Sequence, residues 1–140
     1  MKKKGGKKSK NKLTKPLLAL LIGASMTQIA FAGSQEYTAY RLPRLKVNNY
    51  TNTHVKVTRD RYIKNKVTDI SGTTHANFWV VDENNRAQSK KYKQNVSNVA
   101  TKINYNNSST LDIGQNIKMA MENANYSTGY AFVSGEVDFR

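Results

Sequence analysis

The sequence predicts an all-β fold, a small antiparallel β-sandwich of six or seven strands, placed after an N-terminal signal peptide. Apolar and polar residues alternate along several segments, which is the pattern of strands with one buried face. Asparagine clusters such as Asn48-Asn49, Asn84-Asn85 and Asn106-Asn107 separate these segments and favour turns. The segments recur at a spacing of roughly ten residues, which is typical of antiparallel sandwiches.

The chain begins with the three-part plan of a secretion signal. Residues 1–15 hold eight lysines and no acid, and residues 16–29 are mostly apolar. Small residues at Ala30 and Ala32 suit a signal peptidase, so we expect cleavage before Gly33. The apolar segment is shorter than the about 20 residues that span a bilayer, so no permanent transmembrane anchor is expected. Two alternatives are a tail that binds nucleic acid or the ribosome, and an anchor that is retained without cleavage.

Cleavage would leave residues 33–140 as a single secreted domain. Eight of the 23 basic residues lie in the leader, which leaves 15 basic residues against nine acids and a net charge of +6. A domain of this size can bury a modest core. It has no cysteine, so no disulfide can stabilise it outside the cell. Its stability must therefore come from packing or from a partner.

The first candidate strand is short and covers residues 37–40. In the next segment, Val55 and Val57 alternate with His54 and Lys56. We expect the two valines to face the core and the two basic side chains to face solvent, because alternate residues of a strand point to opposite sides.

The middle of the domain predicts three further strands. Residues 62–70 form one, with a break at the Ser-Gly pair that follows. Residues 74–81 form the strongest, and because both faces are partly apolar we place this strand in the middle of a sheet. Residues 82–85 read as a turn, and residues 86–94 as a polar strand at a sheet edge, where lysines discourage strand addition.

The C-terminal part contains two clear strands and one ambiguous segment. Residues 98–105 alternate as a half-buried strand. In residues 111–123 apolar side chains recur both at every second position and at helical spacing, and Gly114 and the β-rich surroundings favour a strand. Residues 131–139 form the last strand, which we expect to pair with residues 119–123 through the short loop between them.

Three segments carry a resemblance to a known family. Phe78-Trp79, residues 122–127 and residues 133–138 resemble a family of short exported proteins from bacilli, staphylococci and related Gram-positive bacteria, catalogued as a domain of unknown function. Some members are encoded near bacteriocin-type transporters. The resemblance covers about residues 74–140 and implies an exported β-domain, without implying any catalytic residue.

The residues suited to catalysis or metal binding are few. His54 and His75 could each serve as a base, but they lie 21 residues apart and match no compact ligand pattern. Asp82 and Asn84 resemble the start of a calcium loop, although the glycine and the distant glutamate of that loop are absent, which favours a plain turn. No nucleophile motif is present. We therefore expect no enzyme activity, no metal and no cofactor.

The candidate binding site is a cationic patch with interleaved tyrosines, formed by two segments if these are neighbours. Such a patch would attract anionic cell-envelope polymers or lipid headgroups in a salt-dependent way, and no motif indicates specific nucleic-acid recognition. The sequence thus predicts an exported protein that acts by binding and is bacteriocin-like or bacteriocin-associated. The alternative is a structural or accessory surface protein that self-associates or binds an exported partner. The patch consists of Lys56, Arg59, Arg61, Tyr62, Lys64, Lys66, Lys90, Lys91, Tyr92 and Lys93.

Overall fold

The computed structural model describes residues 33–140, so the predicted signal peptide, including Ala30 and Ala32, lies outside the described residues. The described part contains no helix long and apolar enough to cross a membrane. Its elements are β1 (Ser34–Leu42), η1 (a 3₁₀ turn, Arg44–Lys46), β2 (Asn49–Tyr50), β3 (His54–Val55), β4 (Tyr62–Ser71), β5 (Ala76–Asp82), β6 (Tyr92–Gln94), β7 (Thr101–Asn104), β8 (Asn116–Asn123) and β9 (Ala131–Asp138).

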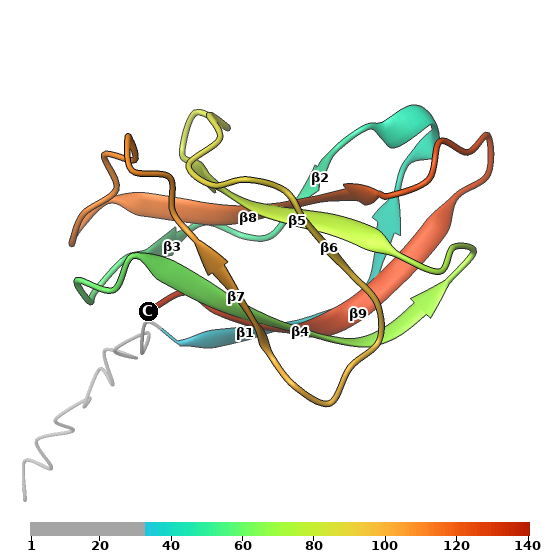
Figure 1. Ribbon diagram of the computed structural model, residues 1–140, viewed down its shortest axis with the longest axis horizontal. Helices are drawn as coiled ribbons and strands as arrows, with labels where there is room; N and C mark the ends of the chain where they lie inside the picture. The colour runs from blue at the N-terminus through green and yellow to red at the C-terminus, as the bar shows by residue number, and fades with distance from the viewer. Residues whose placement is uncertain (1–32) are drawn as a thin grey trace, which may run out of the picture.

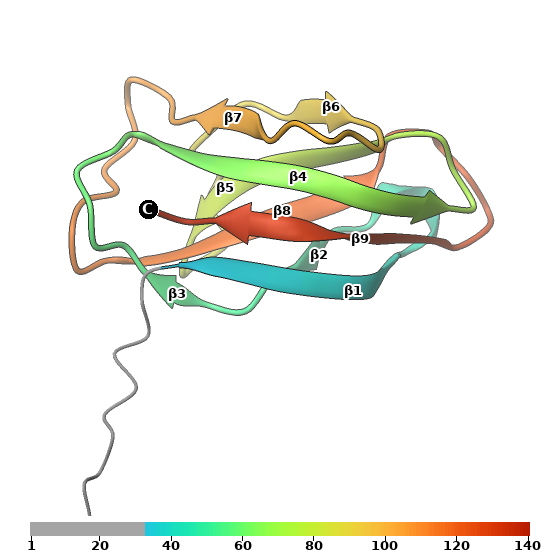
Figure 2. The ribbon, with the colours of Figure 1, turned by 90° about the horizontal axis from the view of Figure 1, so that it is seen from below.

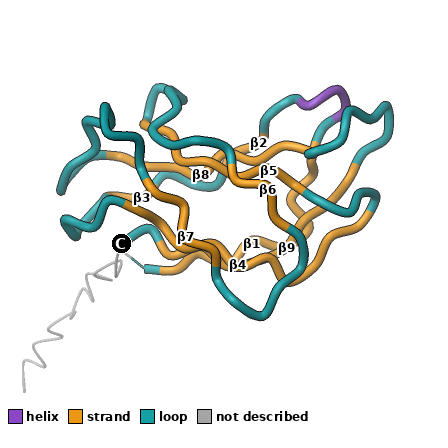
Figure 3. Tube along the Cα trace, in the orientation of Figure 1, coloured by secondary structure: helices purple, strands orange, loops and turns teal. Residues whose placement is uncertain are grey.

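The strands form two antiparallel sheets that pack face to face (Figures 1 and 2). The first sheet has the order β1-β9-β4-β7, and the second has the order β2-β8-β5-β6, with β3 also paired to β8. The predicted all-β antiparallel sandwich is confirmed. Residues 33–140 form nine strands where six or seven were expected, and β2 and β3 are only two residues long. Loops gather at both ends of the strands (Figure 3).

The core lies between the sheets and is built from alternate residues of the long strands. Gly135 on β9 lies opposite Tyr37 on β1 and Val67 on β4, and a side chain there would collide with the Lys66 carbonyl and the Tyr37 hydroxyl. The fully buried side chains of this core include Tyr37, Leu42, Ile63, Val67, Phe78, Val80, Ile103, Ile117, Met119, Met121, Val133, Val137 and Phe139.

A buried polar chain crosses this apolar core. The Tyr37 hydroxyl donates to Asn65 Oδ1 at 2.8 Å, and Asn65 Nδ2 donates to Gln94 Oε1 at 3.1 Å. Burial raises the pKa of Tyr37, and the hydrogen bond to Asn65 opposes this shift. The contacts join both sheets, because β1 and β4 belong to the first sheet and β6 to the second. Buried polar groups that are paired in this way fix one register.

Two predicted strands of the second sheet are confirmed. β5 is central, between β8 and β6, as its two apolar faces indicated. The ambiguous segment is a strand over β8, and Ile117 and Met119 point into the core. The other face of β8 is also covered, since Ala120 packs with Trp79 and Val81 in a second, smaller cluster.

The predicted pairing of the last strand is wrong. β9 lies between β1 and β4 in the first sheet and does not pair with β8, so residues 124–130 cross from one sheet to the other. The physical reason is that β8 already has β5 on one side and the short β2 and β3 on the other. A strand whose two edges are already paired has no free backbone hydrogen-bonding groups for a further strand.

Candidate anion-binding surfaces

The structure contradicts the prediction that Lys56 is an exposed member of the patch. Only 1% of its surface is accessible, whereas Val55 and Val57 are about half exposed at 51% and 49%. Buried and exposed side chains do alternate here, but Lys56 is buried and the valines are exposed, the reverse of the prediction. The reason is that β3 ends at Val55 and the chain then turns over the end of the core. The aliphatic part of the Lys56 side chain covers this end of the core, as the methylene groups of long basic side chains can.

The ammonium of Lys56 is used by the chain itself. It donates to the backbone oxygens of Asp60 and Arg140, the latter at 3.3 Å, and its Nζ lies 5.4 Å from the Tyr105 ring centre. Burial lowers the pKa of Lys56, and the carboxylates of Asp60 and Asp112 oppose that shift. This lysine therefore closes one end of the sandwich.

His54 is also not the solvent-facing side chain that its position predicted. Its ring stacks on Phe139 with centres 4.3 Å apart, and Nε2 lies 2.6 Å from Gln35 Oε1. Burial lowers the pKa of His54, so the neutral ring is favoured. These contacts pack the imidazole against an aromatic and an amide, and they provide neither a carboxylate nor a hydroxyl to orient it as a base.

Arg59 and Arg61 lie in the loop between β3 and β4, at the same end as Lys56. Arg61 donates from Nη2 to the carbonyls of Asn106 and Ser109, at 3.0 and 3.3 Å, and so holds the loop that follows β7. Arg59 lines a shallow hollow of about 610 Å³ together with Asp112. We call this region, made of residues 56–61, residues 106–115 and Arg140, the C-terminal end.

Lys64 and Lys66 share the outer face of the first sheet with acids. Lys64 lies opposite Asp138, and Lys66 lies opposite Glu136 on β9. Tyr62, on the same strand, has the Lys102 ammonium 4.1 Å from its ring centre. Because positive and negative side chains alternate here, this face offers no continuous cationic area.

The second predicted segment lies on the other sheet. The Lys91 ammonium binds Glu122 at 2.8 Å and lies 4.4 Å from the ring centre of Trp79. Tyr92 packs against the core, and its hydroxyl accepts the backbone N–H of Asn104 at 3.2 Å. Lys93 lies opposite Asn77 on the outer face. Lys90 is exposed at the seam between the sheets.

The two segments are therefore not joined into the single patch that the sequence predicted. One faces outward from the first sheet and the other from the second, and Lys56 belongs to neither surface. Sequence reasoning also missed Glu122, which is 3% exposed and accepts from Asn77 as well as from Lys91. The signal available in the sequence was an acid within the largely apolar residues 117–124.

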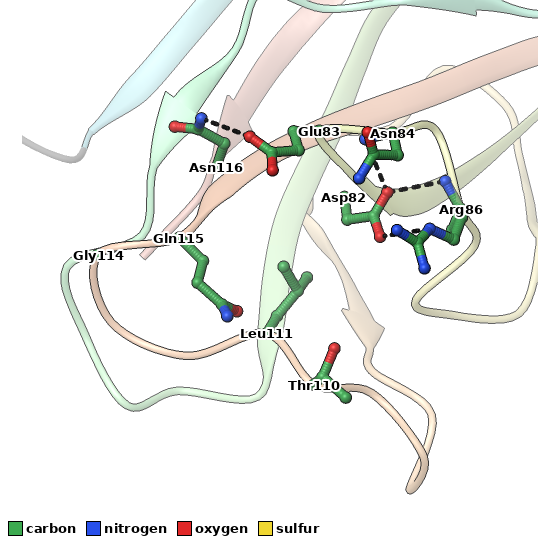
Figure 4. A pocket seen from close by; sticks show the side chains of 9 residues that line it. All are labelled: Asp82, Glu83, Asn84, Arg86, Thr110, Leu111, Gly114, Gln115 and Asn116. Carbon is green, nitrogen blue, oxygen red and sulfur yellow. Dashed lines mark hydrogen bonds and ion pairs between the residues drawn. The ribbon is translucent and has the colours of Figure 1, made fainter.

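The predicted turn after β5 is confirmed, and it borders a hollow of about 380 Å³ (Figure 4). Asp82 Oδ1 accepts the backbone N–H groups of Asn84 and Arg86, both at 2.9 Å, and Glu83 accepts from Asn116 at 3.0 Å. The carboxylates of Asp82 and Glu83 thus bind donors of the chain itself. Within residues 33–140, no three His, Asp or Glu side chains are grouped as a metal site.

A cationic surface that the sequence reasoning missed lies at the opposite end from Arg140. The guanidinium carbons of Arg41 and Arg44 lie 4.9 and 4.5 Å from the ring centre of Tyr130. The signal was present in the sequence, because residues 41–47 and 124–132 contain three basic residues and no acid. Comparison with family models, with curated proteins and with solved structures gave no match to this chain.

Proposed function

We propose that the protein is exported and acts by binding anionic components of a cell envelope, either wall polymers or lipid headgroups. The resemblance of residues 74–140 to short exported Gram-positive proteins adds a bacteriocin-like or bacteriocin-associated role to this proposal. A domain with a net charge of +6 is attracted to polyanions over distances that contacts alone do not reach.

The observation that carries the proposal is the small number of basic residues that the domain uses for its own ion pairs. Within residues 33–140, the four ion pairs involve only Arg86, Lys91 and Arg140. The other twelve of the 15 basic side chains in this part form no ion pair with an Asp or Glu side chain. Eight of these twelve are exposed, and the buried Lys56 is not among those eight. Exposed cations of this kind contribute little to stability and are available to an external anion.

The test is binding of the full chain to vesicles that contain phosphatidylglycerol and to purified teichoic acid, across a range of salt concentrations. The eight lysines before Pro16 would bind polyanions themselves, so the measurement uses a chain with glutamine at those positions, called the leader-neutral chain below. We expect binding that weakens as salt rises. Absence of binding to both probes at low ionic strength would overturn the proposal.

Export is tested separately by the intact mass of the protein recovered from the producing cells and their medium. A released species that begins at Gly33 would agree with cleavage after Ala32. A full-length chain in the membrane fraction would contradict it, and the binding partner would then be sought at the membrane of the producer.

A further inference from the structure

Two loops meet at the end of the sandwich that lies away from Arg140. One joins β1 to β2 and contains η1, and the other joins β8 to β9 (Figures 1 and 2). The backbone N–H of Leu45 donates to the carbonyl of Ser127 at 2.9 Å, which fastens the loops together. We call this surface the arginine–tyrosine end, and its residues are Arg41, Arg44, Leu45, Lys46, Val47, Tyr126, Tyr130 and Phe132.

The positive charge of this end has no compensation from the described part of the chain. Arg41 and Arg44 both lie against the Tyr130 ring, and neither guanidinium forms an ion pair or donates a side-chain hydrogen bond within residues 33–140. An aromatic ring fixes the plane of a guanidinium while its N–H groups stay free for a phosphate. Lys46 adds a third exposed cation next to them.

The same end gathers exposed apolar surface. Leu45 and Val47 are 50% and 56% exposed, and Tyr126 is 72% exposed. Five of the ten large apolar side chains that are exposed in residues 33–140 lie here, including all three exposed aromatics, which are Tyr126, Tyr130 and Phe132. Such a concentration, mixed with cations, differs from the scattered apolar residues of an ordinary surface.

The backbone holds this apolar surface outward. Leu45 and Lys46 are consecutive non-glycine residues in the left-handed region, with φ of 59° and 57°. This conformation is uncommon for leucine, and it presents the Leu45 side chain to solvent although a buried position would be more favourable. Strain of this kind gathers at sites that bind ligands.

We propose that the arginine–tyrosine end docks on the surface of an anionic phospholipid bilayer. The proposal rests on the proposed function and deepens it by naming the lipid surface as the ligand and this end as its site. Arg41, Arg44 and Lys46 contact lipid phosphates, while Leu45, Val47 and Tyr126 enter the boundary between headgroups and acyl chains. A wall polymer needs only the cations, so the exposed apolar side chains favour the bilayer.

The first test removes the charges of this end in the leader-neutral chain. Arg41→Gln, Arg44→Gln and Lys46→Gln together are expected to lower the partition coefficient onto phosphatidylglycerol-containing vesicles by about a hundredfold, since each cation contributes about fivefold. The matched control is Lys90→Gln, Lys93→Gln and Lys102→Gln, which removes the same net charge from exposed positions elsewhere. We expect this control to weaken binding by only about threefold.

The second test removes the apolar contacts and keeps every charge. Leu45→Asn with Tyr126→Ser is expected to weaken vesicle binding by about tenfold and to leave binding to soluble teichoic acid unchanged. Asparagine suits the left-handed backbone at position 45, so the loop should be preserved. Near-ultraviolet circular dichroism of Trp79, a buried residue of β5, verifies the fold of each variant.

The outcomes separate this inference from the broader function. An equal loss for both charge variants would mean diffuse attraction, which overturns the docking site and leaves the broader function standing. Undiminished vesicle binding by the apolar variant would overturn the bilayer as the ligand and favour a wall polymer. Binding of neither probe by the leader-neutral chain would overturn both proposals at once.

Discussion

At the C-terminal end, Lys56, Arg61 and Arg140 direct their donors to oxygens of the chain itself. At the opposite end, the side chains of Arg41 and Arg44 have no such acceptor among residues 33–140. Both ends are basic, although the C-terminal end also contains Asp60 and Asp112 and the opposite end contains no acid. The difference teaches that a basic residue indicates a binding surface only where the fold leaves its N–H groups unused. The basic side chains of the C-terminal end stabilise the fold, whereas those of the arginine–tyrosine end are available for contact with a ligand.

Among the substitutions that test this comparison, the largest effect on stability is expected at Lys56. Lys56→Ala removes the stem that covers the core, and it removes the Lys56 donor from the backbone oxygens of Asp60 and Arg140. We therefore expect the free energy of unfolding to fall by about 3 kcal/mol. Urea denaturation followed by Trp79 fluorescence measures it. Arg44→Ala is the control at the other end and should change stability by less than about 0.5 kcal/mol. Equal losses would contradict the contrast between the ends.

The pH dependence of stability provides the next test, at His54, which stacks on Phe139 beside the C-terminal end. Burial lowers the pKa of His54 in the folded state, so the unfolded chain binds more protons once the pH falls below about 6.5. Stability is therefore fully present above that pH and decreases as the pH falls through the folded-state pKa. Thermal unfolding across this range should show the loss, and His54→Gln should reduce it. His75→Gln, in the segment before β5, is the matched control and should retain the loss in full.

At the arginine–tyrosine end, the same type of substitution should have a smaller effect on stability. Tyr130→Ala removes two exposed cation–π contacts, which predicts a decrease of about 1 kcal/mol in the free energy of unfolding. A double-mutant cycle with Arg44→Ala should give a coupling energy of about 0.5 kcal/mol. A coupling of zero would show that the ring does not hold Arg44 in solution.

The smallest effect has the opposite sign. Leu45→Asn places a residue that tolerates the left-handed region at φ of 59°, so we expect the unfolding free energy to rise by about 0.5 kcal/mol. Differential scanning calorimetry measures the rise in Tm. Together with weaker vesicle binding, this rise would show that Leu45 promotes binding and lowers the stability of the folded domain. A decrease in Tm would mean that Leu45 supports the loop.

Much of the fold was predictable from local patterns. The strands around Ile63 and Val133 follow from alternation, since strand geometry places every second side chain on one face. The strand around Phe78 follows from a run that is apolar on both faces. The candidate site was predictable only in part. Lys91 was selected from its place in a basic run, but the acid that binds it, Glu122, lies 31 residues away. Pairing at that separation leaves no mark in the local sequence.

Arg41 and Arg44 are a second case in which a contact between distant residues could not be predicted from the local sequence. They were absent from the predicted site because they are too sparse to form a run. They become a pair only through Tyr130, which is distant from them along the sequence but lies against both in the fold. The fastening of Leu45 to Ser127 is likewise a contact between two loops that are distant along the chain.

The sequence by itself determined the all-β class, the alternating strands, the turns at Asn84-Asn85 and Asn106-Asn107, and the net positive charge, because each of these depends on neighbouring residues. The turn expected at Asn48-Asn49 is wrong, because Asn49 belongs to β2. Only the tertiary structure decided which face of an alternating segment is buried, as at Lys56, and which strand β9 joins. It also decided which cations remain without partners. These properties depend on which edges and faces other strands already occupy, and that occupancy exists only when the whole chain is folded.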